Sequence, residues 1–166
     1  MGDPVRVIWA REPIPEGPSV FLAGPTPRED RTPSWRPAAI AALEAAWRGP
    51  GPLSVLAPES AVGFRASDYD AQIDWEIAGL SGASAIMFWI PRDVTRLPGF
   101  TTNVEFGLYV GSGRLVLGCP PDCPNPERNR YLIHTARRFG APVCETLSDT
   151  VDSVLGIVKS GLAEQV

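Results

Sequence analysis

The run Ala85–Ile90, AIMFWI, is apolar at every position and constrains the fold more than any other feature of the chain. A strand with one face in water would alternate apolar and polar residues, so a continuous apolar run indicates a strand buried on both faces. Segments with helical spacing of apolar residues separate this run from other short apolar runs. Strands and helices that alternate in this way predict a parallel sheet covered by helices on both sides.

The same analysis divides most of the chain into five strand–helix repeats. The expected strands are Ser19–Ala23, Leu53–Ala57, Ala85–Ile90, Leu115–Gly118 and Pro142–Glu145, with Val5–Trp9 as an extra edge strand. The expected helices are Ser34–Trp47, Tyr69–Leu80, Thr102–Val110, Pro126–Phe139 and Ser148–Leu162. Ser34 and Ser67 are expected near the starts of two of them as capping residues. We therefore predict one α/β domain over 1–166, with a doubly wound, five-stranded parallel sheet in three layers.

The net charge and the cysteines indicate which binding partners and which cellular compartment to expect. A net charge of −4 gives the chain no general attraction for nucleic-acid polymers or anionic membranes. No apolar run reaches the roughly 20 residues that span a bilayer, and the N-terminus has no signal-peptide pattern. Cys119, Cys123 and Cys144 are therefore expected to be free thiols in a reducing cytoplasm.

A parallel sheet of this kind binds ligands beyond the carboxyl ends of its strands. The segments expected there are Gly24–Arg31, Pro58–Asp68, Pro91–Asn103 and Cys119–Asn125. Gly24, Pro25 and Thr26 form a turn directly after a strand, which is a usual place for a phosphate or a sugar. Arg28 could meet a phosphate there, although the chain has no glycine-rich phosphate motif.

Glu105 is the main candidate for a catalytic residue. It is expected in the first turn of the helix Thr102–Val110, so its carboxylate would face the crevice. The positive end of the helix dipole would favour the ionised form that a nucleophile needs. A structural interpretation competes on even terms, because Thr102 and Glu105 have the spacing of a capping box, in which Glu105 would only satisfy N–H groups of its own helix.

Glu76 is the second candidate carboxylate. It lies three residues after Ile73 and four before Leu80, on the expected apolar stripe of its helix. A charge on that side is unusual unless it reaches a site. The alternative is that Glu76 flanks the stripe and extends into water. Asp70 and Asp74 lie on a different face and are expected to be solvated.

Four other residues have both a functional and a structural interpretation. Asn129 lies three residues before Leu132 on an apolar stripe, which makes it a candidate inward-facing amide. Phe21 and Trp89, near strand ends, could stack on a base, although core packing is the commoner fate of such residues. His134 could complete a zinc site with the three cysteines, but the spacing fits no standard zinc motif, so we expect a surface histidine and no metal.

Three segments resemble the nucleoside 2-deoxyribosyltransferase-like family: VFLAGPT from Val20, YDAQIDWE from Tyr69, and LPGFTTNVEFGLYVGSGRLVL from Leu97. The last contains an Asn-x-Glu-x-Gly pattern around Glu105. The resemblance implies a flavodoxin-like sheet and chemistry at a glycosidic carbon. In the family, a glutamate at the position of Glu105 attacks C1′ of a nucleoside, and an acidic residue on the preceding helix, matched by Glu76, handles the proton of the base.

The resemblance also implies the substrate and the assembly. The substrate would be a nucleoside or nucleotide, whose sugar passes to a second base or to water without a metal or an organic cofactor. A homo-oligomer with shared active sites is expected, in which Asn129 matches an amide supplied by the neighbouring subunit. The substrate contacts expected on these grounds are Phe21, Gly24, Pro25, Thr26, Trp89, Asn103 and Asn129.

Two positions differ from the deoxyribosyltransferases. Phe21 stands where they have a tyrosine, and Gly99 stands where they have an aspartate. Both missing groups would contact the sugar or orient the nucleophile, so the sequence leaves open ribose against deoxyribose and transfer against hydrolysis. A hypothesis from another class is a nucleotide-binding or sensor module on the same fold, with Glu105 reduced to a helix cap.

Overall fold

The computed structural model describes residues 3–29, 31–61 and 69–165. Its strands are β1 (Val5–Trp9), β2 (Ser19–Ala23), β3 (Leu53–Ala57), β4 (Ala85–Trp89), β5 (Leu115–Gly118) and β6 (Val143–Cys144). Its helices are α1 (Arg36–Ala46), α2 (Tyr69–Gly82), α3 (Phe100–Tyr109), the 3-10 turn η1 (Pro126–Asn129), α4 (Arg130–Arg138) and α5 (Leu147–Ala163). The predicted alternation of strands and helices is confirmed.

The strands form a parallel sheet in the order β1-β3-β2-β4-β5-β6. Without β1, this is the order of the flavodoxin-like fold, so the predicted fold class is confirmed. The extra strand is also confirmed: β1 pairs with β3 along its whole length, from Val5 opposite Leu53 to Trp9 opposite Ala57. The sheet therefore has six strands, with the additional one at its edge.

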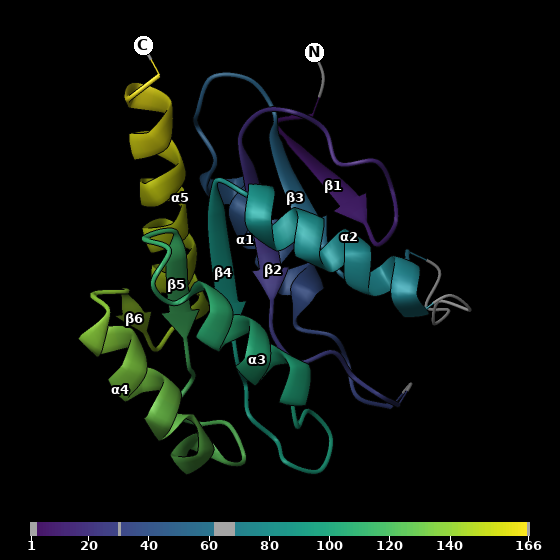
Figure 1. Ribbon diagram of the computed structural model, residues 1–166, viewed down its shortest axis with the longest axis vertical. Helices are drawn as coiled ribbons and strands as arrows, with labels where there is room; N and C mark the ends of the chain where they lie inside the picture. The colour runs from purple at the N-terminus through teal and green to yellow at the C-terminus, as the bar shows by residue number, and fades with distance from the viewer. Residues whose placement is uncertain (1–2, 30, 62–68, 166) are drawn as a thin grey trace.

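Helices cover both faces of the sheet (Figure 1). α1 and α5 pack on one face, against inward side chains such as Val20, Leu22 and Met87. α2, α3 and α4 pack on the other face, against the alternate side chains, which include Phe21, Ile86 and Phe88. The strands β2, β3 and β4 are buried at every position. This agrees with the continuous apolar sequence of β4 and the largely apolar sequences of β2 and β3, whose serines Ser19 and Ser54 are also buried.

Four helices begin at other residues than expected: α4 begins at Arg130, after η1, and α5 begins at Leu147, one residue early. The starts of α1 and α3 bear on the site. α1 starts at Arg36 with Trp35 at the N-cap and no side-chain cap, while the Ser34 hydroxyl accepts a hydrogen bond from the Arg36 amide. α3 starts at Phe100 instead of Thr102, because Gly99 adopts a left-handed conformation that lets the helix begin earlier. The cap proposed at Ser67 lies outside the described residues.

β2 and β4 mark the point where the strand order reverses, and such a point opens a crevice at the carboxyl ends of the strands. The two strand ends approach closely at Gly24, whose φ is +150°. A Cβ atom at this position would lie only 2.3 Å from the carbonyl oxygen of Trp89, so the approach requires glycine. The turn after β2 and the loop after β4 are thereby held side by side.

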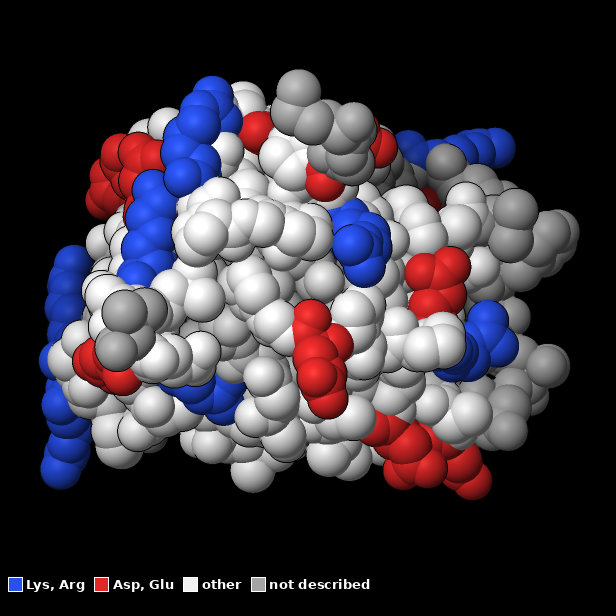
Figure 2. Space-filling view, turned by 90° about the horizontal axis from the view of Figure 1, so that it is seen from above, with Lys and Arg blue, Asp and Glu red and all other residues white. Residues whose placement is uncertain are grey.

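The end of the molecule at which the strands begin, opposite the crevice, carries both positive and negative side chains. Figure 2 shows that basic and acidic side chains are interspersed on this face among uncharged ones. The termini lie at the same end (Figure 1). Within the described residues, none of the helices is both long and apolar enough to cross a lipid bilayer.

Candidate active site

Glu105 lies in the second turn of α3, and the capping-box interpretation is wrong. The helix begins at Phe100, its N-cap is Gly99, and no side chain caps it. Glu105 is half-buried, and among the described residues its carboxylate accepts no hydrogen bond. Neither the first-turn position nor a direct benefit from the helix dipole holds, because the dipole acts mainly within the first turn.

A buried arginine fixes the start of α3. Arg92, only 3% exposed, follows β4 and donates from Nη1 to the carbonyl oxygen of Pro98 at 2.5 Å and from Nη2 to Oδ1 of Asn103 at 2.7 Å. A Cβ atom on Gly99 would lie 2.9 Å from Nη1 of Arg92. Glycine therefore fits this position, and the hydrogen bonds of Arg92 order the segment before Glu105.

Glu76 lies on α2, the neighbouring helix, and is half-buried. Its Oε1 accepts a hydrogen bond of 2.7 Å from Nε2 of Gln72, one turn earlier. The predicted apolar stripe is partly wrong: Trp75, Gly79 and Leu80 are buried, whereas Ile73 is 37% exposed. Glu76 borders the buried side of α2, and its charge acts on Glu105 of α3.

The pKa values of Glu105 and Glu76 are both raised, because both carboxyl groups are partly buried. The pKa of Glu105 is raised from 4.5 to about 7: burial contributes most to the rise, the charge of Glu76 adds to it, and the charge of Arg36 opposes it. Burial also raises the pKa of Glu76, against the opposing effects of the Gln72 hydrogen bond and of Arg36. The sequence predicted that Glu105 would be the ionised member; in the free protein it is instead the carboxyl group held more strongly in its neutral form.

Arg36 brings a positive charge to the pair from the other side of the sheet. It is 1% exposed and donates from Nε to the carbonyl oxygen of Leu22 at 3.1 Å, from Nη2 to that of Gly24 at 2.9 Å, and from Nη1 to Oγ1 of Thr26 at 3.0 Å. Its guanidinium also lies 4.6 Å from the centre of the Trp35 ring. The group is thus fixed at the carboxyl end of β2.

Glu59 is a third carboxylate of this cluster. Its Oε1 lies 2.5 Å from Nη1 of Arg36 and accepts a hydrogen bond of 2.7 Å from the Ser34 hydroxyl. Burial lowers the pKa of Arg36, and the carboxylates of Glu59, Glu105 and Glu76 oppose that change, in decreasing order. One cation and three carboxylates therefore meet at the crevice.

The turn Gly24–Thr26 is held by α1 and lies against the start of α3. The carbonyl oxygen of Pro25 accepts a hydrogen bond of 3.0 Å from Nε1 of Trp35, and Thr26 is exposed. Arg28, two residues after Thr26, is exposed and lies 5.9 Å from the centre of the Phe100 ring. Exposed groups at this rim are thus Thr26, Arg28 and Phe100.

The two aromatic candidates have different positions. Phe21 is fully buried in the core and packs on Trp75, with 6.0 Å between the ring centres, so it has no surface left for a substrate. Trp89 is 9% exposed at the end of β4, next to the close approach of Gly24. For both residues the alternative to stacking on a base is packing in the core, and Phe21 packs entirely in the core.

The two candidate amides both contact Arg92. Asn103 is an exposed residue whose Oδ1 accepts from Nη2 of Arg92, as described above. Asn129 is 1% exposed; its Oδ1 accepts from Nε of Arg92 at 2.9 Å, and its Nδ2 donates to the carbonyl oxygen of Ile90 at 2.9 Å. Asn129 faces inward as predicted, but both ends of its amide are engaged within its own chain.

The cysteines and the histidine do not form a metal centre. Cys119, Cys123 and Cys144 are free thiols, and His134 is exposed. In the part of the chain that the structure describes, no three His, Cys, Asp or Glu side chains are grouped so that they could hold a metal ion.

Two open cavities of about 680 and 890 Å³ lie at the other edge of the sheet, next to the amino ends of the strands. The first is lined by Asp3–Val7, Glu44 and Gly51, and the second by Pro18, Arg114 and the end of α5. Neither brings together carboxylates and a buried cation. We therefore place the candidate site at the carboxyl ends of β2, β3 and β4, where the charged groups converge.

The comparison with known families identifies the chain. The model of the family described as nucleoside 2-deoxyribosyltransferase like matches residues 17–123, which include β2, α1, β3, α2, β4, α3 and β5. The chain belongs to this family. No curated protein matches the sequence significantly. Membership of the family indicates, at a coarse level, glycosyl transfer from a nucleoside, and all four charged residues of the cluster lie within the matched region.

Sequence reasoning missed Arg36, Glu59 and Arg92 in this family site. Arg36 and Arg92 are buried, which is rare for arginine, and the sequence shows no sign of that burial. A signal for Glu59 did exist, because it lies two residues after β3, in the segment Pro58–Asp68 that is expected at the crevice.

Proposed function

We propose that this protein cleaves or transfers the N-glycosidic bond of a nucleoside or nucleotide through a covalent bond between Glu105 and C1′ of the sugar. The observation that carries the proposal is the coupling of Glu105 to Glu76 on the neighbouring helix, within a family of nucleoside glycosyl transferases. Retaining glycosidases use two carboxyl groups in the same way, one as nucleophile and one as acid and base.

In the first step, the C1′–N bond breaks and a bond forms between C1′ and a carboxylate oxygen of Glu105. The single proton that the pair holds near neutral pH passes through Glu76 to the leaving base. Glu105 is then an ester, and Glu76 is ionised. Because burial disfavours two charges at this place, the pair is suited to hold one proton and release it as the base leaves.

In the second step, the ionised Glu76 removes a proton from water or from an incoming base. The new nucleophile attacks C1′, the ester bond to Glu105 breaks, and the proton remains on the pair. The sugar leaves with retained configuration, because each step inverts C1′ once. Water as acceptor gives hydrolysis, and a second base gives transfer.

The pH dependence of base release follows from the pair. The form with one proton is lost as the pH rises through about 7, where the buried Glu105–Glu76 pair gives up its last proton. We expect kcat/KM for base release to be highest on the acid side of pH 7 and to fall about tenfold per pH unit above it. Chromatography of free base, from a panel of nucleosides and nucleoside monophosphates between pH 5 and 9, measures this.

The panel also separates an enzyme from a binding module. An enzyme releases base from at least one member of the panel, and added free base of a second kind yields a new nucleoside if the reaction is transfer. Binding detected by calorimetry without any release would favour the nucleotide-binding or sensor hypothesis. A preference for monophosphates over nucleosides would assign the 5′ phosphate to the rim formed by Thr26 and Arg28.

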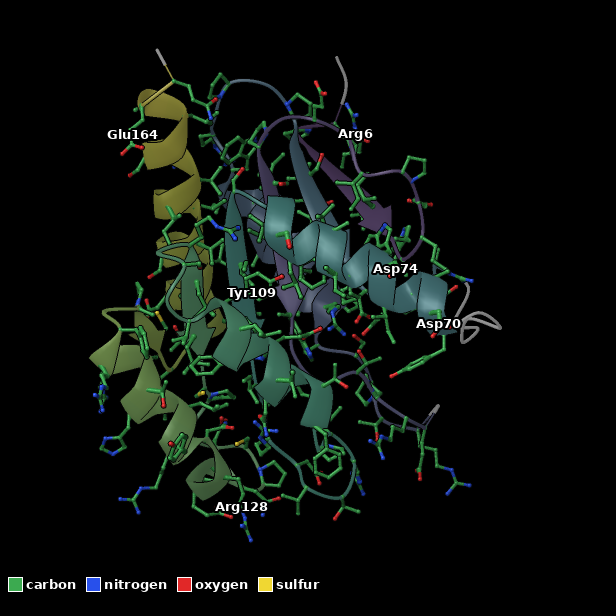
Figure 3. The ribbon with its side chains drawn as sticks, in the orientation of Figure 1. Arg6, Asp70, Asp74, Tyr109, Arg128 and Glu164 are labelled. Atoms are coloured by element: carbon green, nitrogen blue, oxygen red, sulfur yellow. The ribbon has the colours of Figure 1, made fainter. Side chains whose placement is uncertain are left out.

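The homo-oligomer expected from the resemblance is supported by an exposed apolar surface next to the site. A 3.0 Å hydrogen bond between the hydroxyl groups of Ser81 and Tyr109 joins the C-terminal ends of α2 and α3. Figure 3 shows Tyr109 between these two helices. Each helix exposes apolar side chains at intervals of four residues, which places them on one side of the helix. These are Tyr69, Ile73 and Ile77 on α2 and Phe100, Val104 and Leu108 on α3, 37–73% exposed.

We expect the wild-type protein to form a dimer or a larger assembly that buries this surface. Light scattering should give a multiple of the 17.9 kDa chain, and Ile77→Glu or Leu108→Glu should reduce the mass to that of one chain. Val94→Glu is the matched control, since Val94 is 49% exposed in the loop after β4. A wild-type protein that stays monomeric at all concentrations would contradict this assembly.

A further inference from the structure

The turn formed by residues 9–12, hereafter the β1 turn, lies outside the region 17–123 that the family model matches. β1 pairs with β3 up to its last residue, so the turn lies beside the segment that follows β3. The amide of Ala10 donates a hydrogen bond of 3.0 Å to the carbonyl oxygen of Glu59 in that segment. Because the carboxylate of Glu59 pairs with Arg36, the β1 turn contacts the backbone of the candidate site.

The second contact of the β1 turn is with α2. Nε1 of Trp75 donates a hydrogen bond of 2.8 Å to the carbonyl oxygen of Glu12, where the loop after β1 lies beside α2 (Figure 1). Trp75 is only 9% exposed, so its indole N–H would lose its acceptor at a largely buried position if the turn moved away. Trp75 directly precedes Glu76, and the bond therefore holds α2 at the helical turn that carries the proposed acid and base.

The β1 turn keeps an unfavourable backbone conformation. Arg11 has a φ of +71°, and no other non-glycine residue of the described ranges has a positive φ. Glu12 fixes this conformation twice: its amide donates to the carbonyl oxygen of Trp9 at 3.0 Å, and its Oε2 accepts from the Trp9 amide at 2.9 Å. Ala10 and Ile14, on either side, pack against the core cluster that contains Trp75. Strain that the surroundings maintain in this way is typical of segments whose shape serves a site.

We propose that the β1 turn is a positioning element of the active site, which holds Glu76 in place through the hydrogen bond between Trp75 and Glu12. This inference rests on the proposed function, in which Glu76 passes a proton to the leaving base. Proton transfer requires the carboxyl oxygen to lie within hydrogen-bond reach of the base. A displacement of about 1 Å can lower the rate of such a step by up to about 100-fold.

Trp75→Phe tests the bond, because phenylalanine keeps a ring against Phe21 and removes the indole donor. We expect kcat for base release to fall about tenfold, while KM changes by less than about twofold, since the rest of the site is unaltered. The Glu76 carboxyl group, followed by carbon-13 NMR and assigned with Glu76→Gln, should titrate at lower pH than in wild type. Burial is the main cause of its raised pKa, and a displaced α2 would expose it.

Trp47→Phe is the matched control. Trp47 is 2% exposed and donates from Nε1 to the carbonyl oxygen of Gly51 at 2.9 Å, but it packs on the other face of the sheet. The variant loses the same kind of bond, so its melting temperature should fall by a similar amount. Its kcat and the Glu76 titration should equal those of wild type, which separates lost stability from lost position.

Two substitutions of Glu12 test the turn itself. Glu12→Ala removes the acceptor of the Trp9 amide and should lower kcat in the same way as Trp75→Phe. Glu12→Gln keeps an acceptor oxygen and should restore the wild-type kcat. Glu16→Ala, exposed in the same loop, should behave as wild type. Because Glu12 is exposed, its variants decide the question if Trp75→Phe does not fold.

The outcomes separate this inference from the proposed function. A wild-type kcat in Trp75→Phe or in Glu12→Ala overturns the inference, and so does an equal loss of kcat in Trp47→Phe. If wild-type protein releases no base, the proposed function fails and the Glu76 titration decides alone. A shift to lower pH confined to Trp75→Phe and Glu12→Ala then supports the positioning of Glu76 by the β1 turn, and an unchanged titration overturns it.

Discussion

Replacing Glu105 with glutamine is expected to abolish base release while it stabilises the protein above pH 7. The amide cannot attack C1′, and loss of a nucleophile lowers kcat by at least about 10⁴-fold in comparable covalent enzymes. The stabilising effect has a separate cause. The folded protein pays for an ionised carboxylate in a half-buried position without a hydrogen bond from a described residue, and glutamine removes that charge.

The sign of the pH effect follows from the raised pKa of Glu105. Its value in the folded protein, about 7, is above the ordinary 4.5 of the unfolded chain, so the folded state binds the proton more tightly. This stabilisation is complete below pH 4.5 and is lost as the pH rises through 7. The difference corresponds to about 3 kcal/mol, so Glu105→Gln should exceed wild type by up to that amount at pH 8 and by little at pH 4.5.

Urea unfolding of both proteins at pH 5, 6, 7 and 8 measures the difference. Glu164→Gln at the exposed end of α5 is the control and should follow wild type at each pH. A helix cap would behave in the opposite way, because its loss costs about 0.5–2 kcal/mol. If Glu105→Gln is less stable than wild type at pH 8, the electrostatic account of this residue is wrong.

Replacing Arg92 with methionine is expected to destabilise the protein by about 3–5 kcal/mol, because several acceptors lose their charged donor together. These acceptors are the carbonyl oxygen of Pro98, Oδ1 of Asn103 and the buried Oδ1 of Asn129. The melting temperature should fall by roughly 10 °C. Base release should fall as well, because Arg92 sets the start of the helix that carries Glu105.

Arg92→Lys separates geometry from charge. Lysine keeps the positive charge but lacks the planar group that reaches acceptors in η1, in α3 and in the loop between β4 and α3 together, so it should recover only part of the stability. Arg96→Met, exposed in the same loop, should change the stability by less than about 0.5 kcal/mol. Equal melting temperatures for Arg92→Met and Arg96→Met would contradict the structural role of Arg92.

The fold was predictable because its signals are local. The continuous apolar run at Ala85–Trp89 and the largely apolar run at Leu53–Ala57 indicate strands buried on both faces, and both lie inside the sheet. The start of α3 was not predictable by the same means. It depends on the left-handed Gly99 and on Arg92, which is seven residues earlier in the chain and buried.

For the candidate site, the sequence singles out the two carboxylates Glu76 and Glu105 but not their electrostatics. Glu76 and Glu105 come from segments that the family pattern marks, and the structure couples them. Which of the two holds the proton depends on burial and on Arg36, and neither follows from helical spacing. Phe21 was predicted to contact the substrate but is buried in the core. The sequence could not distinguish these positions, because an aromatic residue near the end of a strand looks the same in either place.

The central claim is that Glu105 becomes covalently bonded to the sugar. Rapid mixing of the protein with a nucleoside from the panel that releases base, followed by acid quench and peptide mass spectrometry, tests it most directly. We predict a mass increase equal to the sugar on the peptide that contains Glu105, formed at the rate of base release and absent in Glu105→Gln. Base release at the full rate with no sugar on any peptide would contradict the account.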